Sequence, residues 1–338
     1  MYAQKLETLP PPPGVIGSLK AGFDVVSNHV ALILMPVIVD IALWLGPRLG
    51  ISEVLSPFYQ MAFARVQRGL ASQEDVQQLV AFQELFNEGL QRFNLFSLVS
   101  RLQTFPIGIS SLLAKTMPVE TPLGVQDMNQ VGSPLSLIGT MFLLVLVGWV
   151  IGGLYFRWVS SKALGARGIG IGISQVIFQT LLLSVVWFFF LMTLSIPLML
   201  LLTVLTFINP MLASIALFGL VLVSFWLIVP LFFIPHGIFV RRQNAFSSIH
   251  SSFRMARYTL PTSAMFVFTT FILSTGLNYL WSVPDGNSWM TLIGIAGHAF
   301  ITTALLAASF VYYHDMTSWL QVVIEKLQQK NNPPARQA

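Results

Sequence analysis

The sequence contains no cysteine and few charged residues, and each absence excludes classes of protein. Without cysteine the chain has no disulfide, no cysteine-ligated zinc site and no thiol nucleophile. Charged residues make up only 9% of the 338 residues, whereas a soluble domain uses about 25%. Hydrophobic residues make up 55%. The charge is too sparse to cover a water-exposed surface, so much of the surface is expected to face lipid.

Motifs that carry common enzymatic chemistry are absent as well. The sequence has no H-E-x-x-H, G-x-S-x-G or Walker A pattern. The glycines of Gly168-Ile-Gly170-Ile-Gly172 do not follow G-x-G-x-x-G, and no βαβ unit is predicted around them. No stripe of basic residues with interleaved aromatics indicates nucleic-acid binding. We therefore expect no catalytic residue, no metal, no cofactor and no nucleic-acid partner, and we expect that the protein is not an enzyme.

Six apolar segments are long enough to be membrane-spanning helices, each of which needs about 20 mostly apolar residues. They cover residues 30–46, 135–156, 176–206, 211–235, 263–281 and 289–313. The third segment is long enough to tilt or to break near Pro197, where a backbone donor is missing. The predicted fold class is therefore all-α, a polytopic membrane helical bundle of about six transmembrane helices.

The positions of lysine and arginine predict how the chain is oriented in the membrane. Six of the 18 lie in the long connection 47–134, to which the rule applies less well. The other 12 lie in four hydrophilic segments, which carry Lys5 and Lys20; Arg157, Lys162 and Arg167; Arg241, Arg242, Arg254 and Arg257; and Lys326, Lys330 and Arg336. The short connections around Asn209 and Asp285 carry none. Short cytoplasmic connections carry the excess of basic residues, so both termini are predicted to lie in the cytoplasm. The membrane is predicted to be the plasma membrane of the cell.

The hydrophilic parts complete the predicted domain organisation. Residues 1–29 are expected to form a cytoplasmic segment with an interfacial amphipathic helix, and residues 314–338 a cytoplasmic tail. Between the first span and the five-helix region 135–313, residues 47–134 are expected to be extracytoplasmic. Two apolar stripes at helical spacing there, the second capped by Ser72, predict an amphipathic helical hairpin followed by a proline-rich loop. The hairpin lies on the membrane surface or forms a binding domain, and the sequence leaves both open.

A short internal repeat precedes the first and fifth predicted spans. Ser18-Leu-Lys-Ala-Gly-Phe23 aligns with Ser248-Ile-His-Ser-Ser-Phe253, and each stretch is predicted to be an interfacial helix. The expected apolar faces of the two helices are Ile16, Leu19, Phe23 and Val26 in the first, and Phe246, Ile249, Phe253 and Ala256 in the second.

The Ser-x-x-x-x-Phe helix before a span, together with Val311-Tyr-Tyr-His-Asp315 at the end of the last span, resembles a group of bacterial multi-pass families. They include the membrane domain fused to some glycerophosphodiester phosphodiesterases. An arginine is commoner in that group where His314 stands. The resemblance implies a six-helix bundle and brings no catalytic residue with it.

Asp40 and His298 are the candidate residues for an intramembrane polar site. Each is an ionisable side chain well inside a predicted span, where such groups are costly and commonly functional. Counting about 1.5 Å per residue from the span ends places both near the middle of the membrane. One hypothesis is that they pair and form a proton or substrate site. The favoured alternative is that Asp40 bonds a neighbouring serine, threonine or backbone group and is purely structural.

Two further features have both a packing and a functional explanation. Gly148-x-x-x-Gly152 with Gly153 puts small residues on one face of the second span, and packing within the chain is favoured over dimerisation. Four arginines near the fifth span are candidate contacts for anionic lipid head groups: Arg241, Arg242, Arg254 and Arg257. The orientation of the chain in the membrane is by itself enough to explain their presence.

Three classes of function remain open. The first is a non-catalytic scaffold or accessory component of envelope or transport assembly, in contact with the bilayer and with unidentified protein partners. The second is a small transporter that uses Asp40 and His298. The third is a lipid-active enzyme with His236, His314 and Asp315 at one interface. We rank them in this order, because polar residues inside the predicted spans are few.

Overall fold

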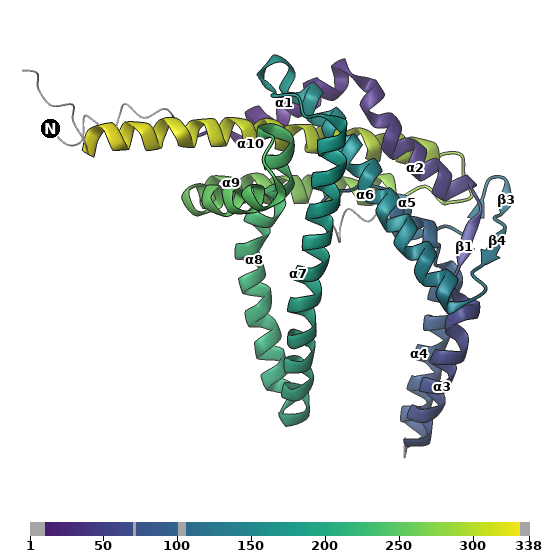
Figure 1. Ribbon diagram of the computed structural model, residues 1–338. Helices are drawn as coiled ribbons and strands as arrows, with labels where there is room; N and C mark the ends of the chain where they lie inside the picture. Colours follow the sequence, from purple (N-terminus) through teal and green to yellow (C-terminus); the bar gives the residue numbers. More distant parts are fainter. Residues whose placement is uncertain (1–10, 70–71, 101–105, 332–338) are drawn as a thin grey trace, which may run out of the picture.

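The structure is a computed structural model that describes residues 11–69, 72–100 and 106–331, most of which lie in helices (Figure 1). The α-helices are α1 (Val15–Asn28), α2 (Leu34–Leu45), α3 (Ser52–Gly69), α4 (Gln73–Arg92), α5 (Leu113–Thr116), α6 (Pro134–Leu164), α7 (Ile173–Ile208), α8 (Pro210–Arg241), α9 (Ala245–Trp281) and α10 (Thr291–Asn331). Short 3₁₀ helices are η2 (Val30–Ile33), η3 (Leu95–Ser100) and η4 (Gly165–Arg167). Lys5, Arg336 and the side chain of Lys330, which contributed to the predicted orientation, lie outside the described residues.

The prediction of an all-α multi-pass membrane fold is confirmed. Within the described residues, four helical stretches are long and apolar enough to cross a membrane: Pro134–Arg167, Ile173–Ile208, Ala245–Trp281 and Thr291–Gln328. The count rises to six when two bent pairs are each taken as one span. These pairs are Val15–Asn28 with Val30–Leu45, bent by 97°, and Pro210–Ser224 with Trp226–Arg241, bent by 42°.

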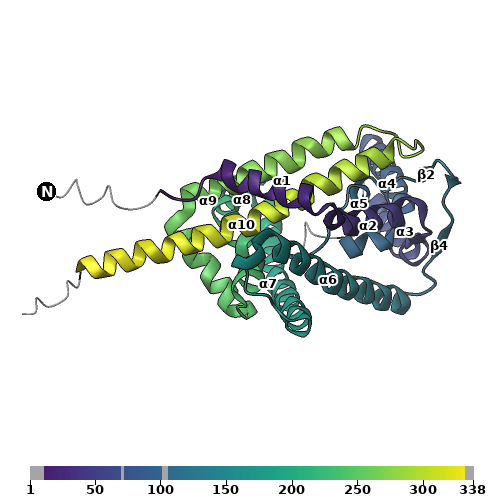
Figure 2. The same cartoon turned by 90° about the horizontal axis from the view of Figure 1, so that it is seen from above.

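From α6 to α10 the helices are longer than the predicted spans, whereas α2 is shorter than the first of them. Although Pro197 lies inside α7, the helix continues through it to Ile208, so the break considered there is not observed. The last helix, α10, continues to Asn331, and most of the predicted tail is therefore helical and continuous with the last span. Seen from above, α1 lies along α10, and the beginning of α1 and the end of α10 point to the same end of the molecule (Figure 2).

The internal repeat is matched position by position when Val15 is aligned with Ala245. The backbone leaves helical geometry at His29 (φ −136°, ψ 59°) and at Thr259 (φ −127°, ψ 17°), which are equivalent positions. The buried residues of α1 and their equivalents in α9 correspond as well: Val15, Ser18, Gly22 and Val26, and Ala245, Ser248, Ser252 and Ala256. Both copies therefore consist of a helix with a small-residue face, a kink and a second helix.

The apolar faces predicted for these two helices are divided in the structure. Ile16 is 82% exposed and Phe246 is 61% exposed, whereas Val26 and Ala256 of the same faces are buried. Small residues also contribute to the buried face of α1. A Cβ atom added to Gly22 would lie 2.3 Å from the carbonyl oxygen of Ala304 and 2.6 Å from the Cβ atom of Ala308. α1 and α10 are thus in direct backbone contact, the close approach that small residues allow in membranes.

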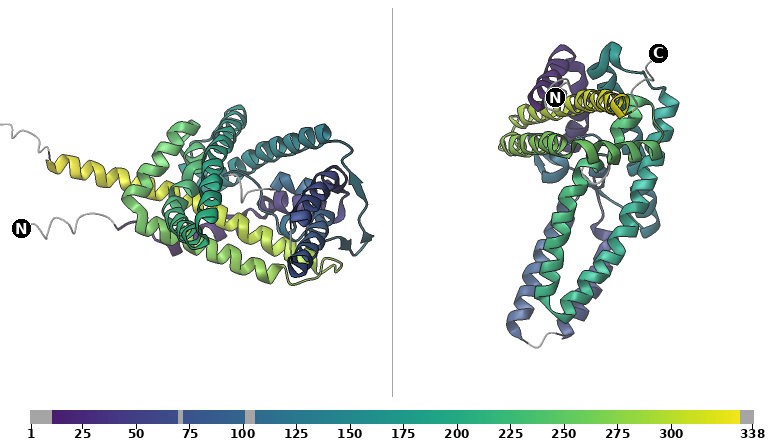
Figure 3. Two further views of the ribbon diagram at one scale, coloured as in Figure 1. Left: turned by 90° about the horizontal axis from the view of Figure 1, so that it is seen from below. Right: turned by 90° about the vertical axis from the view of Figure 1, so that its left-hand side faces the viewer.

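Two helical hairpins project from the same side of the body, one made by α7 and α8 and the other by α3 and α4 (Figures 1 and 3). The most apolar stretch of α7 has no buried residue, and aromatic side chains such as Phe189 and Phe207 are exposed there. We refer to the exposed part of this hairpin, residues 185–224, as the apolar arm. The amphipathic hairpin predicted between the first and second spans is confirmed as α3 and α4, which are joined by ring contacts of Tyr59 and Phe63 with Phe82 and Phe86.

Arg48 attaches the α3–α4 hairpin to the body. It lies in β1 (Arg48–Gly50), which pairs in parallel with β4 (Met128–Gln130), while β2 (Glu120–Thr121) pairs with β3 (Gly124–Val125). The Arg48 guanidinium is almost fully buried and donates hydrogen bonds to the carbonyl oxygens of Gln91 and Arg92 at the end of α4. A cation there also interacts favourably with the helix dipole. Burial lowers the pKa of Arg48 from its usual value.

We expect Arg48→Met to loosen the hairpin while leaving the body folded, because the last carbonyl groups of α4 lose their buried donor. The local cost is about 2 kcal/mol. Amide hydrogen exchange of residues 88–94 should accelerate by at least about tenfold. Arg65→Met, on the exposed surface of α3, is the matched control and should leave this exchange unchanged. Equal exchange in both variants would show that Arg48 does not hold the hairpin.

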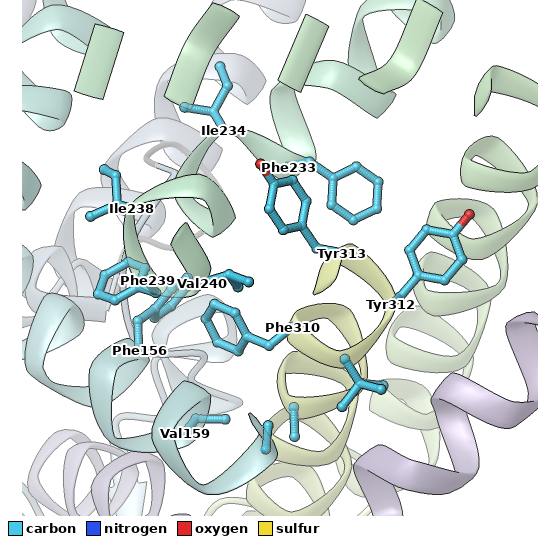
Figure 4. Packing of buried hydrophobic residues seen from close by; sticks show 14 of the residues in the cluster. Phe156, Val159, Phe233, Ile234, Ile238, Phe239, Val240, Phe310, Tyr312 and Tyr313 are labelled. Atoms are coloured by element: carbon cyan, nitrogen blue, oxygen red, sulfur yellow. The ribbon is translucent and has the colours of Figure 1, made fainter. Parts of the chain in front are cut away.

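The largest part of the buried core lies where α8 and α10 cross, at the base of the apolar arm (Figure 4). Phe233 packs against Tyr312 and Tyr313, with ring centroids 5.8 and 5.9 Å apart. Phe310 reaches from α10 to Phe156 of α6, at 5.9 Å. This aromatic core connects α6, α8 and α10 and fixes the base from which the arm projects.

Candidate functional site

Residues 106–113, Pro-Ile-Gly-Ile-Ser-Ser-Leu-Leu, pass through the helical body and are almost all buried. Ile107 and Ile109 belong to the main apolar core, although their backbone is not helical. Gly108 lies against α6, where a Cβ atom on Gly152 would be 2.7 Å from the Gly108 Cα atom. Non-helical backbone at membrane depth is tolerated where protein surrounds it. We call residues 106–113 the inserted segment. The sequence predicts an extracytoplasmic proline-rich loop here; the segment is irregular, as a loop is, and its burial in the body was not predicted.

Asp40 binds the inserted segment. Its carboxylate is fully buried and accepts three hydrogen bonds. The donors are the Ser111 hydroxyl and the backbone N–H groups of Leu112 and Leu113, with both N–H···O distances 3.1 Å. Among the described residues no cation forms an ion pair with Asp40. The N–H groups at the start of a helix have no backbone acceptor within it. The Asp40 carboxylate supplies the missing acceptors and so holds the start of α5.

His298 binds the preceding residue of the same segment. Its Nε2 atom lies 3.1 Å from the Ser110 hydroxyl, and its Nδ1 atom lies 2.6 Å from Oδ1 of Asn278 in α9. With the Asn278 oxygen as acceptor, Nδ1 is the donor of that bond. The imidazole is 1% exposed. Both ring nitrogens of His298 thus have a hydrogen-bonding partner within the body.

Asp40 and His298 are therefore connected through consecutive serines and do not bond each other. The hypothesis that they form a direct pair is not supported, because neither side chain has the other among its hydrogen-bonding partners. The alternative that Asp40 bonds a serine and backbone groups describes its contacts. The serines and Asn278 were not identified from the sequence. Two features of the sequence could have indicated them: a polar Ser-Ser pair within the apolar run 107–113, and a lone Asn in a predicted span.

The residues considered for lipid chemistry do not gather at one interface. His236 is 2% exposed within the aromatic core, where its Nε2 atom lies 2.8 Å from the Ser309 hydroxyl. Asp315 contacts His314 at 2.9 Å and Arg167 at 3.4 Å. No group of three or more His, Asp or Glu residues in the described part of the chain could hold a metal ion.

The glycine face of α6 packs within the chain, as predicted. A Cβ atom on Gly148 would lie 2.6 Å from the carbonyl oxygen of Val99, and one on Gly153 would lie 2.5 Å from the Thr180 hydroxyl. Together with the contact between Gly152 and the inserted segment, this face receives backbone or side chains from three other parts of the chain. The glycines thus make room for the inserted segment and for α7.

The structure places one of the four candidate arginines in a pocket. Arg254 lines a pocket beside the first turns of α9, and Arg241 lies in the last turn of α8. Arg257 lies over the ring of Tyr258, with 6.0 Å from its guanidinium carbon to the ring centroid. Arg242 follows α8 in a left-handed conformation (φ 52°) and is exposed. Only Arg254 of the four lines the pocket.

Comparison of the chain with protein-family models, with curated proteins and with solved structures finds no match. The resemblance to the membrane domain of glycerophosphodiester phosphodiesterases therefore stays a prediction. Any account of function has to come from the contacts of the chain itself.

Proposed function

We propose that the protein is a non-catalytic scaffold of the plasma membrane, with both termini in the cytoplasm. The observation that carries this proposal is the use of the polar side chains inside the spans. Asp40 and His298 hold the inserted segment, and the Tyr155 hydroxyl bonds Thr303 at 2.8 Å. These groups fix one arrangement of the helices. Their hydrogen bonds are made within the body, which suits a structural role better than transport.

The two projecting hairpins also support a scaffold. The apolar arm and the α3–α4 hairpin present long exposed surfaces on the same side of the body. An apolar surface of that extent has to be covered by lipid or protein. The beginning of α1 and the end of α10 lie at the same end of the molecule, which agrees with termini on one side of the membrane. The scaffold would hold a partner of the envelope or of a transport assembly.

A small transporter is the second candidate, and the inserted segment favours it. Broken backbone beside a buried carboxylate is the way many transporters build a site at mid-membrane. In such a protein Asp40 or His298 would have to gain or lose a proton, or exchange its present partners for substrate. The scaffold requires neither.

Non-titrating variants separate the two candidates. We expect Asp40→Asn and His298→Gln, expressed in cells that lack the chain, to restore the wild-type phenotype in proportion to the amount of protein in the membrane. Both amides keep hydrogen-bonding atoms near the original positions, but neither gains or loses a proton near neutral pH. Asp24→Asn on the exposed side of α1 is the matched control. A variant that accumulates to the wild-type level and fails to restore the phenotype would overturn the scaffold in favour of transport.

A further inference from the structure

A pocket of about 440 Å³ lies beside the first turns of α9, at the connection from α8. Its lining residues are Gln243, Phe246, Ser247, His250, Ser251 and Arg254. These side chains supply hydroxyl, amide, imidazole and guanidinium groups, and none is a carboxylate. The pocket is therefore rich in hydrogen-bond donors and free of negative charge along its lining.

The rear of the pocket is fixed by hydrogen bonds. The Ser251 hydroxyl lies 2.7 Å from Oε1 of Gln243 and 3.3 Å from the hydroxyl of Tyr313. Arg254 of α9 lines the pocket, and Arg241 lies in the last turn of α8. Among the described residues neither arginine forms an ion pair. An anion in the pocket would meet the uncompensated positive charge of Arg254.

The internal repeat provides a comparison within the chain. The buried positions of α1 and α9 are alike, whereas the pocket-lining positions differ. Where α9 has Ser251 and Arg254, the equivalent positions of α1 hold Ala21 and Asp24. The equivalent of the pocket-lining His250 is Lys20, so α1 carries one cation and one anion at these positions. The α9 copy thus lacks the carboxylate that Asp24 supplies in α1.

From the pocket, the arginine that lines it and this contrast, we propose that the protein binds the phosphate group of an anionic phospholipid at the start of α9. Arg254 supplies the charge, Ser247 supplies a hydroxyl donor, and His250 lines the same pocket. Guanidinium groups bind phosphate with charge-assisted hydrogen bonds. Phe246 lines the pocket and is 61% exposed, which provides an apolar contact for the lipid beyond its phosphate. A free phosphate ester shares the charged chemistry but not this contact.

The test measures lipid binding by the full-length protein in a neutral detergent. Native mass spectrometry with added phosphatidylglycerol or phosphatidylcholine gives the apparent affinity of each lipid. We expect phosphatidylglycerol to bind tighter than phosphatidylcholine, and Arg254→Gln to weaken phosphatidylglycerol by about tenfold, as expected for one charged hydrogen bond. Arg257→Gln removes the same charge one turn along α9, outside the pocket, and should change the affinity by no more than about twofold.

Each alternative outcome overturns the proposal. Equal weakening by Arg254→Gln and Arg257→Gln would show attraction to the basic surface without a site. An unchanged affinity in Arg254→Gln, at a melting temperature equal to that of the wild type, would remove the pocket from lipid binding. Displacement of the lipid by an equal concentration of soluble glycerol phosphate would identify a free phosphate ester as the ligand. This site does not depend on the scaffold proposal, since neither variant alters the residues that bind the inserted segment.

Discussion

Replacing Gly22 by leucine should detach α1 from α10 and unfold the protein at a temperature well below that of the wild type. A side chain at this position would enter the space occupied by the backbone of Ala304 and by Ala308. Backbone atoms in a continuous helix cannot move aside as a flexible side chain can. We expect a loss of at least about 3 kcal/mol in the free energy of unfolding. Thermal unfolding in detergent, followed by circular dichroism, measures the change.

Gly17 provides the matched control for this substitution. It lies in the same helix, and a Cβ atom added there would meet nothing within 4 Å. Gly17→Ala should leave the protein equally stable or stabilise it by up to about 1 kcal/mol, because alanine is the better helix former. If Gly22→Leu and Gly17→Ala gave the same melting temperature, the close packing of α1 on α10 would be wrong.

Asp40→Ala should release the inserted segment from the body. The substitution leaves the Ser111 hydroxyl and the N–H groups of Leu112 and Leu113 without their acceptor. Each buried donor left unpaired costs about 1–3 kcal/mol, so the total loss for the three donors is about 3–9 kcal/mol. A carboxylate that binds three donors of one segment is expected to have a larger effect than any single hydrogen bond in the body.

The absence of cysteine makes this release measurable in the otherwise native chain. Ile109 is fully buried in the inserted segment, so a maleimide should not react with Ile109→Cys alone. In the double variant Asp40→Ala, Ile109→Cys the reaction should approach the rate of Val125→Cys, a position that is 71% exposed. Protection of the thiol introduced by Ile109→Cys in both backgrounds would show that other contacts hold the segment.

The elements that could be predicted from the sequence are those whose residues determine them locally. The apolar runs predicted the long helices, since a helix that crosses lipid must satisfy its own backbone hydrogen bonds. The second helix of the α3–α4 hairpin begins as predicted, with the Ser72 hydroxyl accepting the backbone N–H of Asp75 at 3.0 Å. In each of these cases the neighbouring residues carry the whole signal.

The buried face of α1 could not be predicted from large apolar residues. In a soluble protein Ile16 would mark the inward side of the helix. Lipid is as apolar as a protein core, so in a membrane a large side chain such as Ile16 can face outward while small ones such as Ser18 and Gly22 pack inward. The hydrophobic periodicity of the sequence therefore does not indicate which face of the helix is buried in the protein.

The inserted segment could not be predicted for a different reason. Its apolar run is shorter than a span, and Pro106 and Gly108 are typical of loops. Its position depends on residues far away in the sequence, Asp40 in α2, Gly152 in α6 and His298 in α10. Asp40 and His298 were recognised as unusual in a span, but what they bind is a property of the tertiary structure.

The length of α10 has a mechanical consequence. Its 41 residues form one unbroken helix of about 60 Å, and His298 lies near the end opposite Asn331. A stiff rod of that length is a lever: a tilt of about 10° moves its far end by about 10 Å, while atoms near the pivot shift by a small fraction of that. A load applied to the last turns of α10 would therefore reach the hydrogen bond between His298 and Ser110 as a small, directed displacement.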